Sequence, residues 1–185
     1  MRLFVAVNFS DEVKNRILEV REQLRGQTLR GNFTRPENLH LTLAFIGETP
    51  EEKLDSLYGI IEGINAPPFE MSINCSGCFS RSGKELWWIG TDPKSPCHAF
   101  LENINRQLFD HLLAAGFLAG SASDSRRFSA HITIGREIKR SRPVVLDFPE
   151  IKAKVDRISL MKSEHVKGKL TYTEIFGKEL SSEMT

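Results

Sequence analysis

The chain has little cysteine, little net charge and no long apolar run. Three cysteines in 185 residues are too few for a closed disulfide framework. A formal net charge of +1 gives no overall field for nucleic acid, so affinity for phosphate must come from a local site. No run reaches the roughly 18 apolar residues of a membrane helix, and the opening MRLFVAVNFS turns polar too soon for a secretory signal. We therefore expect a reduced, cytoplasmic protein that does not enter a membrane.

The remaining composition is that of an ordinary globular protein, with 40% hydrophobic and 26% charged residues. Apolar alternation predicts strands, and apolar spacing of three and four predicts helices. The predicted strands are 2–8, 39–46, 69–75, 85–90, 129–135, 154–161 and 170–176. The predicted helices begin after Ser10, at a Thr49-Pro50 capping box and at Ser95-Pro96. Hairpins outnumber βαβ crossovers, which favours an α+β fold with mainly antiparallel sheets. We expect residues 1–185 to form a single domain and the protein to be a monomer.

One short pattern occurs twice, half a chain apart. His40-Leu41-Thr42-Leu43 returns as His131-Ile132-Thr133-Ile134, and both copies lie in predicted strands. Because side chains alternate along a strand, the apolar pair of each copy faces a core and the His-Thr pair faces the other way. A single copy is typical of a solvated strand face. Two copies predict two pseudo-symmetric lobes with helices outside and a cleft between them.

Two facing imidazoles suit acid–base chemistry on a phosphate. Histidine has an ordinary pKa of about 6.5, so one ring can be neutral while the other is protonated. Phosphoryl displacement runs in line, with the attacking and leaving oxygens on opposite sides of phosphorus. One ring can then take a proton from water while the other protonates the leaving oxygen. A strained cyclic phosphate would not require a metal, but symmetry does not show which histidine has which role.

These motifs resemble a known family. HLTLAFIGE, preceded by RPEN, and HITIGR resemble the two signatures of the two-histidine phosphoesterases. The chain is most similar to the bacterial and archaeal RNA 2′,3′-cyclic phosphodiesterases, historically called 2′-5′ RNA ligases. The opening RLFVAVNF, the Trp87-Trp88 strand and the closing SEHVKGKLTYTEI extend the resemblance to nearly the whole chain. It implies a bilobal fold and hydrolysis of a 2′,3′-cyclic end of RNA or a nucleotide to a 2′-phosphomonoester, without cofactor or metal.

The resemblance also assigns roles to residues. It implies that His40 is the proton donor and His131 the proton acceptor, and that Thr42 and Thr133 bind phosphate. Arg136 matches a phosphate-binding arginine of the family. Strand alternation places Arg136 on the face opposite His131, unless a bulge or bend at Gly135 breaks the alternation.

Other patterns have a functional and an ordinary interpretation. Four basic residues lie near the second motif: Arg126, Arg127, Arg140 and Arg142. They could contact an RNA backbone or only line a solvated loop. Cys75 and Cys78 have C-x-x-C spacing but lie at the end of a strand, which favours ordinary buried thiols. Phe45 shares the alternation of the apolar residues and is expected in the core. One of Trp87 and Trp88 is expected in the core, and the other could pack between lobes or stack on a base.

Three alternatives remain open at this point. The same site could act on small cyclic nucleotides, on 2′-5′ linkages or on a nucleotide-sugar cyclic phosphate. Ligation of RNA ends is the same chemistry run backwards. A non-catalytic module that binds RNA ends would keep the basic residues but would not need both histidines.

Overall fold

A computed structural model describes residues 1–118 and 128–181, and all structural statements concern those residues. The helices are α1 (Asp11–Gly26), α2 (Leu54–Glu62) and α3 (Pro96–Ala114), with short 3₁₀ turns at Pro36–Asn38 and Glu51–Lys53. The strands are β1 (Arg2–Asn8), β2 (Arg30–Phe33), β3 (His40–Glu48), β4 (Phe69–Ile73), β5 (Cys75–Arg81), β6 (Lys84–Gly90), β7 (His131–Lys139), β8 (Ile151–Val155), β9 (Arg157–Val166) and β10 (Lys169–Glu179).

Most of the strands form one sheet of eight strands. Its order is β10-β9-β1-β3-β7-β6-β5, with β2 beside β7, and β4 and β8 form a separate pair. Every one of these pairings is antiparallel. The two motif strands, β3 and β7, meet in the middle through the pair Leu41–Ile132. The prediction of an α+β fold with mainly antiparallel strands is confirmed, and the two halves share a sheet.

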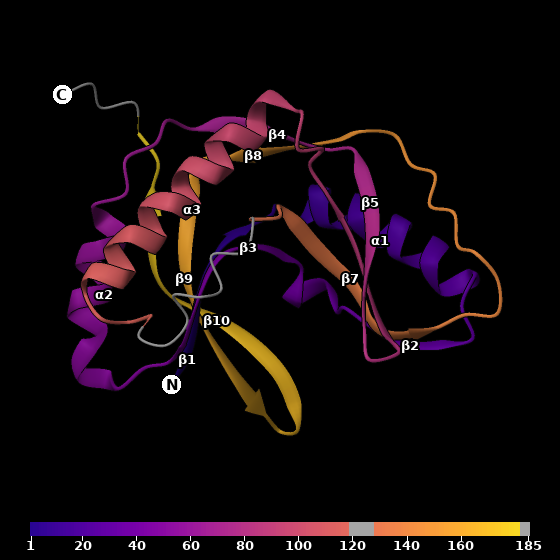
Figure 1. Ribbon diagram of the computed structural model, residues 1–185, viewed down its shortest axis with the longest axis horizontal. Helices are drawn as coiled ribbons and strands as arrows, with labels where there is room; N and C mark the ends of the chain where they lie inside the picture. The colour runs from indigo at the N-terminus through magenta and orange to yellow at the C-terminus, as the bar shows by residue number, and fades with distance from the viewer. Residues whose placement is uncertain (119–127, 182–185) are drawn as a thin grey trace.

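Each half of the sheet has its own helical cover (Figure 1). On one half, α2 contacts β10 and α3 contacts β3; on the other half, α1 contacts both β7 and β2. The helices bury apolar stripes, such as Ile17, Val20 and Leu24 of α1, against one face of the sheet. The opposite face therefore remains available for a cleft. No helix in the described part of the chain is both long and apolar enough to cross a membrane.

Local signals place several element ends where we expect them. The Ser10 hydroxyl accepts a hydrogen bond from the Val13 amide and caps α1. Gly116, with φ of +75°, follows the end of α3. Both central residues of the Ser82-Gly83 turn have positive φ, as a tight hairpin between β5 and β6 requires.

The predicted capping box at Thr49 is wrong. The Thr49 hydroxyl donates to the carbonyl oxygen of Gly47 at 3.3 Å, and its amide donates to Met1 at 2.8 Å. These bonds keep Thr49 in an extension of the β1–β3 ladder, so the chain enters α2 through a 3₁₀ turn at Glu51–Lys53.

Two predicted strands are each divided where the chain changes sheets. Residues 69–75 break at Asn74, because β4 pairs with β8 whereas β5 pairs with β6. Residues 154–161 break at Asp156, because β8 pairs with β4 whereas β9 pairs with β1. Hydrophobic alternation continues across Asn74, so the pattern there reads as one strand, whereas at Asp156-Arg157 the apolar positions shift by one residue.

Two predictions of burial are also wrong. Phe45 is 53% exposed, because a register shift between Val5 and Ala6 leaves Leu43 without a partner on β1 and reverses the alternation beyond it. Cys78 is exposed because it lies on β5, the last strand of the sheet.

Candidate active site

The two histidines are anchored in the same way on different strands. His40 begins β3, and its Nδ1 lies 2.8 Å from the carbonyl oxygen of Asn38. His131 begins β7, and its Nδ1 lies 2.8 Å from the carbonyl oxygen of Ser129. Because a carbonyl oxygen only accepts hydrogen bonds, Nδ1 carries the proton in both rings. Each Nε2 is therefore the atom that can exchange a proton. The His-x-Thr repeat did not predict these anchors, since both acceptors are backbone atoms.

Both copies of the repeat direct their polar side chains to the same face of the sheet. Leu41 and Ile132 are fully buried and opposite each other, so the histidines and threonines on either side of them turn to the other face. All four polar side chains are half-buried. The Thr42 hydroxyl lies 3.1 Å from Nε2 of His40. The repeat thus places two imidazoles and two hydroxyls at the centre of the sheet.

A bulge brings Arg136 to this group. The register of β6 and β7 shifts between the pairs Trp88–Thr133 and Trp87–Gly135, which leaves Ile134 without a partner. Ile134 and Gly135 are consequently both buried, and Arg136 returns to the face of Thr133. Arg136 can share a face with His131 only if the alternation is broken between them, and the bulge that breaks it lies at Ile134, one residue before the expected Gly135. Arg136 lines a cavity together with His40 and Thr133.

The pKa values of both histidines are lowered. Burial lowers the pKa of His40 and that of His131 below the ordinary value of 6.5, and the hydrogen bond to a backbone carbonyl opposes this effect in each. The positive charge of Arg136 lowers the pKa of both rings further. His131 also lowers the pKa of His40. An anion bound beside Arg136 would offset that charge and raise the pKa of both histidines.

Aromatic side chains surround each imidazole. Phe4 and Tyr172 lie 4.9 and 5.1 Å from the His40 ring, between ring centroids. Phe79 and Trp88 lie 5.3 and 6.3 Å from the His131 ring. These rings desolvate the imidazoles and limit their rotation. Sequence reasoning singled out only the tryptophan, because the other three rings come from strands far from either motif.

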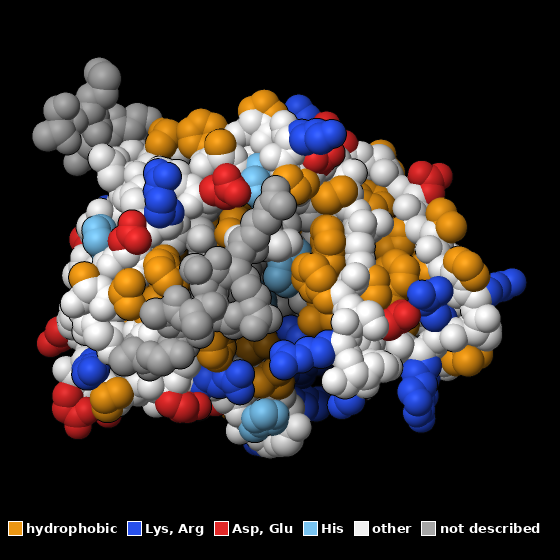
Figure 2. Space-filling view, in the orientation of Figure 1, with side chains coloured by type: hydrophobic (Ala, Val, Ile, Leu, Met, Phe, Trp, Pro, Cys, Tyr) orange, Lys and Arg blue, Asp and Glu red, His pale blue; other side chains and the backbone are white. Residues whose placement is uncertain are grey.

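Two cavities meet at His40, Arg136, Leu170 and Tyr172. One, of about 450 Å³, continues along Arg25, Phe33, Thr34 and Arg35. The other, of about 480 Å³, continues along Arg2, Phe4, Thr42, Phe45, Ser163 and His165. Figure 2 shows a histidine side chain near the centre of the molecular face, with hydrophobic side chains beside it and Lys and Arg side chains gathered below. An apolar and cationic cleft of this kind suits a nucleotide.

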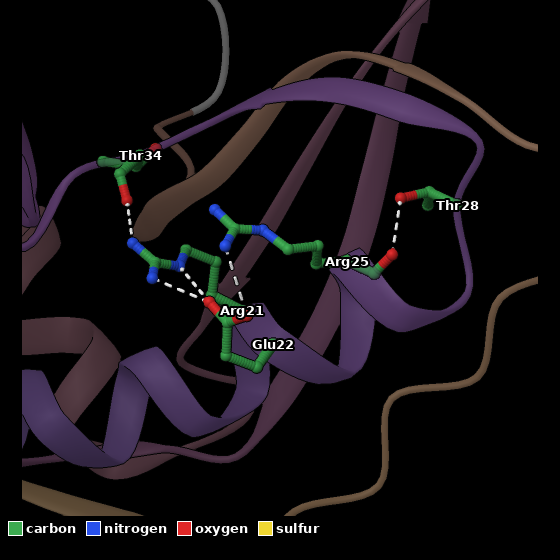
Figure 3. A network of polar contacts seen from close by, with 5 residues as sticks. All are labelled: Arg21, Glu22, Arg25, Thr28 and Thr34. Atoms are coloured by element: carbon green, nitrogen blue, oxygen red, sulfur yellow. Dashed lines mark hydrogen bonds and ion pairs between the residues drawn. The ribbon is translucent and has the colours of Figure 1, made fainter.

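A polar network fixes one wall of the first cavity (Figure 3). Arg21 of α1 donates to the carbonyl oxygen of Thr34 at 2.6 Å and pairs with Glu22 at 2.7 Å. Glu22 also pairs with Arg25 at 3.4 Å, and the Arg25 guanidinium lies 4.7 Å from the centre of the Phe33 ring. Helix α1 therefore holds the segment after β2 against the cleft.

The other predicted basic contacts are not all in the cleft. Arg140 pairs with Glu85 at 3.0 Å and lies 5.9 Å from the ring centre of the buried Trp87, whereas the neighbouring Trp88 turns to His131. Arg140 thus lies on the opposite side of the sheet from the histidines. Arg142 is exposed, and its carbonyl accepts a bond from Arg140. Arg126 and Arg127 lie outside the described residues.

The donor set contains imidazoles, hydroxyls and a guanidinium. In residues 1–118 and 128–181, no three His, Cys, Asp or Glu side chains are placed to hold a metal ion together. The arrangement can move protons and bind a phosphate with these side chains alone.

Comparison with known proteins gives consistent matches. A sequence model of the family described as LigT-like phosphoesterases matches residues 7–88, a range that includes His40 and Thr42. The RNA 2′,3′-cyclic phosphodiesterase of Archaeoglobus fulgidus is 32% identical over 80% of this chain and 78% of its own. That of Thermotoga maritima is 30% identical over 88% of this chain and 87% of its own.

The fold matches solved structures along nearly its whole length. The crystal structure of Escherichia coli LigT complexed with 3′-AMP superposes with a TM-score of 0.84 at 25% sequence identity. The match covers 98% of both chains. Sequence and fold thus lead to one group of proteins.

Proposed function

This chain belongs to the LigT-like phosphoesterases, the family of the RNA 2′,3′-cyclic phosphodiesterases, and on that premise we propose how it works. The protein is an enzyme that hydrolyses a 2′,3′-cyclic phosphate of RNA or a nucleotide. In our proposal, His40 donates a proton, His131 accepts one, and the product is a 2′-phosphomonoester. The observation that carries the proposal is the matched anchoring of the two rings at Nδ1, which leaves Nε2 of each ring as the proton-exchanging atom on the face that holds Arg136.

The reaction needs one in-line displacement. Water attacks phosphorus and gives its proton to Nε2 of His131, while the bond from phosphorus to O3′ breaks. The departing O3′ takes the proton from Nε2 of His40. The rings have then exchanged protonation states, and proton exchange with solvent restores them.

Three further side chains bind the phosphate in this proposal. The hydroxyls of Thr42 and Thr133 donate to the non-bridging oxygens, and Arg136 offsets their negative charge. Phosphate binding raises the pKa of the half-buried His40 and so holds the proton that this ring must donate. Because the ring strain of the cyclic ester already lowers the barrier, the proposal uses no metal and no cofactor.

The substrate is RNA with a 2′,3′-cyclic end or a cyclic nucleotide. The aromatic and cationic lining of both cavities supports a nucleotide on the His40 side. Action at 2′-5′ linkages by the same site is the second candidate, and a separate cavity lined by Phe79 and Arg136 supports it. A non-catalytic RNA-end-binding module would not need two anchored imidazoles. The monomeric state, the cytoplasmic location and a single functional unit over 1–185 stay predictions.

The test is turnover of 2′,3′-cyclic AMP by the purified chain, with and without a chelator. We expect 2′-AMP, identified by ³¹P NMR against 2′-AMP and 3′-AMP standards, at a rate that survives exhaustive chelation. Formation of 3′-AMP would reverse the assignment of the leaving oxygen. Loss of turnover in chelator, restored by a divalent ion, would contradict the metal-free mechanism.

A further inference from the structure

The segment RPEN before the first motif takes no part in the proposed proton transfers, yet it holds the anchor of His40. Its last three residues form the 3₁₀ turn Pro36–Asn38. The carbonyl oxygen of Asn38 is the acceptor that lies 2.8 Å from Nδ1 of His40. The Asn38 side chain, with only 8% of the residue exposed, therefore lies next to an atom on which the orientation of His40 depends.

The Asn38 side chain joins this turn to β10. Its Nδ2 donates to the carbonyl oxygen of Leu170 at 3.0 Å, and the Arg35 guanidinium donates to the same oxygen. Two residues further along β10, Tyr172 lies edge-on to the His40 ring, with 5.1 Å between the ring centroids. One short stretch of β10, the end strand of the sheet, thus contacts both the ring of His40 and the turn that anchors it.

Packing alone does not explain an amide at position 38. The Oδ1 atom of Asn38 is buried and accepts no hydrogen bond from the residues that the structure describes. A buried acceptor without a donor is unfavourable, so an apolar side chain of the same branching would fill this space at a lower free energy. Sequences depart from such rules chiefly where a functional site requires it. The donor atom, Nδ2, is then the reason for an amide here.

The second histidine has the same anchor without this support. Ser129 holds the equivalent position, and its carbonyl oxygen lies 2.8 Å from Nδ1 of His131. Residues 128–130, the described residues before β7, form no 3₁₀ turn, and Ser129 is only half-buried. The two halves thus differ in how the anchor is held. The supported anchor belongs to the histidine that donates the proton in the proposed function.

We propose that Asn38 is a positioning residue for His40: its amide ties the Pro36–Asn38 turn to β10 and keeps the Asn38 carbonyl aligned with Nδ1 of the ring. The inference deepens the proposed function and rests on it for the role of His40. Burial lowers the pKa of His40, and the hydrogen bond to the Asn38 carbonyl opposes this effect. Without the tie the carbonyl is less well aligned, so the pKa of His40 falls further and less of the ring carries the proton.

Other charged and titratable groups also face His40. Arg136 and His131 of β7 lower its pKa, and Tyr172 of β10 contacts the ring. The two cavities that meet at the ring are also lined by Arg2, Arg25, Arg35 and His165. A substitution of Asn38 leaves all these groups in the chain, so a change at His40 alone reports on the anchor.

The experiment removes the amide in two ways. Asn38→Leu keeps the branching of the side chain, and Asn38→Ala adds no bulk. Asn105→Ala is the matched control, because Asn105 of α3 also donates its amide to a strand carbonyl, that of Leu43 at 2.7 Å, on the helix side of β3. Melting temperatures identify the folded variants. ¹⁵N NMR of the imidazoles in the free protein then gives the pKa and the tautomer of each ring.

In wild type we expect the neutral form of both rings to carry its proton on Nδ1. In the Asn38 variants the pKa of His40 should be lower and its tautomers mixed, with a much smaller change at His131 and none in the control. A His40 ring with the wild-type pKa and tautomer in a folded Asn38 variant overturns the proposal, and so does an equal change in Asn105→Ala.

The pH profile of kcat/KM for 2′,3′-cyclic AMP separates positioning from a structural role. Above the optimum, the rate is proportional to the protonated fraction of the donor, whereas below the optimum it depends on the neutral acceptor. The Asn38 variants should lose about two- to tenfold on the alkaline side, the effect of weakening one hydrogen bond. They should lose nothing on the acid side. An equal loss at every pH would mean that Asn38 is only structural and overturns the proposal.

The inference and the proposed function fail in different ways. A lowered pKa of His40 with a raised rate on the acid side and an unchanged rate on the alkaline side would keep the positioning role and reverse the roles of the two histidines. A wild-type enzyme without turnover overturns the proposed function, and the NMR result on the free protein still decides whether Asn38 positions His40.

Discussion

Arg136 is the residue that connects the two histidines electrostatically. Its charge lowers the pKa of both rings, and it lines the cavities on the His40 side as well as the cavity of Phe79. A cation at this position has opposite effects in the free enzyme and in the complex. It disfavours protonated histidine before substrate binds, and it attracts the phosphate whose charge reverses that effect.

The first residue-scale prediction concerns pH. The proton acceptor must be neutral and the proton donor charged, so the rate follows a bell. In the free enzyme the pKa of both histidines lies below 6.5, so kcat/KM should be greatest below pH 6.5. Bound phosphate raises the pKa of both, so kcat should be greatest at a higher pH than kcat/KM. Full pH profiles with 2′,3′-cyclic AMP measure both optima. A kcat/KM optimum above that of kcat would contradict this electrostatic account.

The second residue-scale prediction concerns Arg136 itself. Loss of a charge-assisted hydrogen bond to phosphate costs about 1.5–3 kcal/mol, so Arg136→Ala should lower kcat/KM by about 10- to 100-fold. Arg106→Ala is the control, since Arg106 is exposed on α3, outside the cleft face, and donates to Asn103. The kcat/KM optimum of Arg136→Ala should also move to higher pH. An unchanged pH optimum with reduced activity would mean that Arg136 binds substrate without affecting the histidines.

Among the strands, β3 and β7 show how small irregularities build the site. Each carries a His-x-Thr motif and then a bulge, and each bulge brings the fifth residue after its histidine to the cleft face: Phe45 on β3 and Arg136 on β7. Regular strands would have placed both side chains on the core face. The repeat therefore extends beyond the motif, with different side chains in the two halves.

A close approach of two strands fixes the position of His131. Gly90 of β6 is opposite His131, and a Cβ at Gly90 would lie 2.1 Å from the carbonyl oxygen of Ala130. We predict that Gly90→Ala destabilises the fold by about 1–3 kcal/mol, as overpacking against backbone does. Gly59→Ala in α2 meets no atom within 4 Å and should stabilise by about 0.5–1 kcal/mol.

Urea denaturation of the two glycine variants measures the difference. Stabilities in the reverse order would show that the strands around His131 are not packed as described. A Gly90→Ala variant as stable as wild type would require the Ala130 carbonyl to move at little cost.

The elements differ in how far the sequence could predict them. Local rules located the start of α1, the end of α3 at Gly116 and the Ser82-Gly83 turn, because a cap or a positive φ acts within a few residues. The break at Asn74 could not be predicted, because it depends on which distant strand pairs on each side, whereas the break at Asp156 coincides with two successive polar residues that interrupt the alternation. The bulges at Leu43 and Ile134 could not be predicted either, since a bulge depends on the register against a partner strand.

At the scale of the whole molecule, the two halves of the large sheet meet at β3 and β7. The pair Leu41–Ile132 links β3 to β7, and the histidines lie on either side of it. Both imidazoles thereby belong to one sheet with helices on its other face. The repeat predicted which residues would meet. It could not predict the carbonyl anchors or the aromatic rings of Phe4, Tyr172 and Phe79, because none of these belongs to the motif.

The central claim is that His40 and His131 act as one unit on one phosphate. The most direct test is kcat on 2′,3′-cyclic AMP for wild type, His40→Ala, His131→Ala and the double variant, with the melting temperature of each. We predict that each single change lowers kcat by about 10²–10⁴-fold and that the double change costs little more, because either loss already stops the coupled proton transfers. All variants should remain folded. A folded His131→Ala enzyme with undiminished kcat, or losses that multiply in the double variant, would contradict the account.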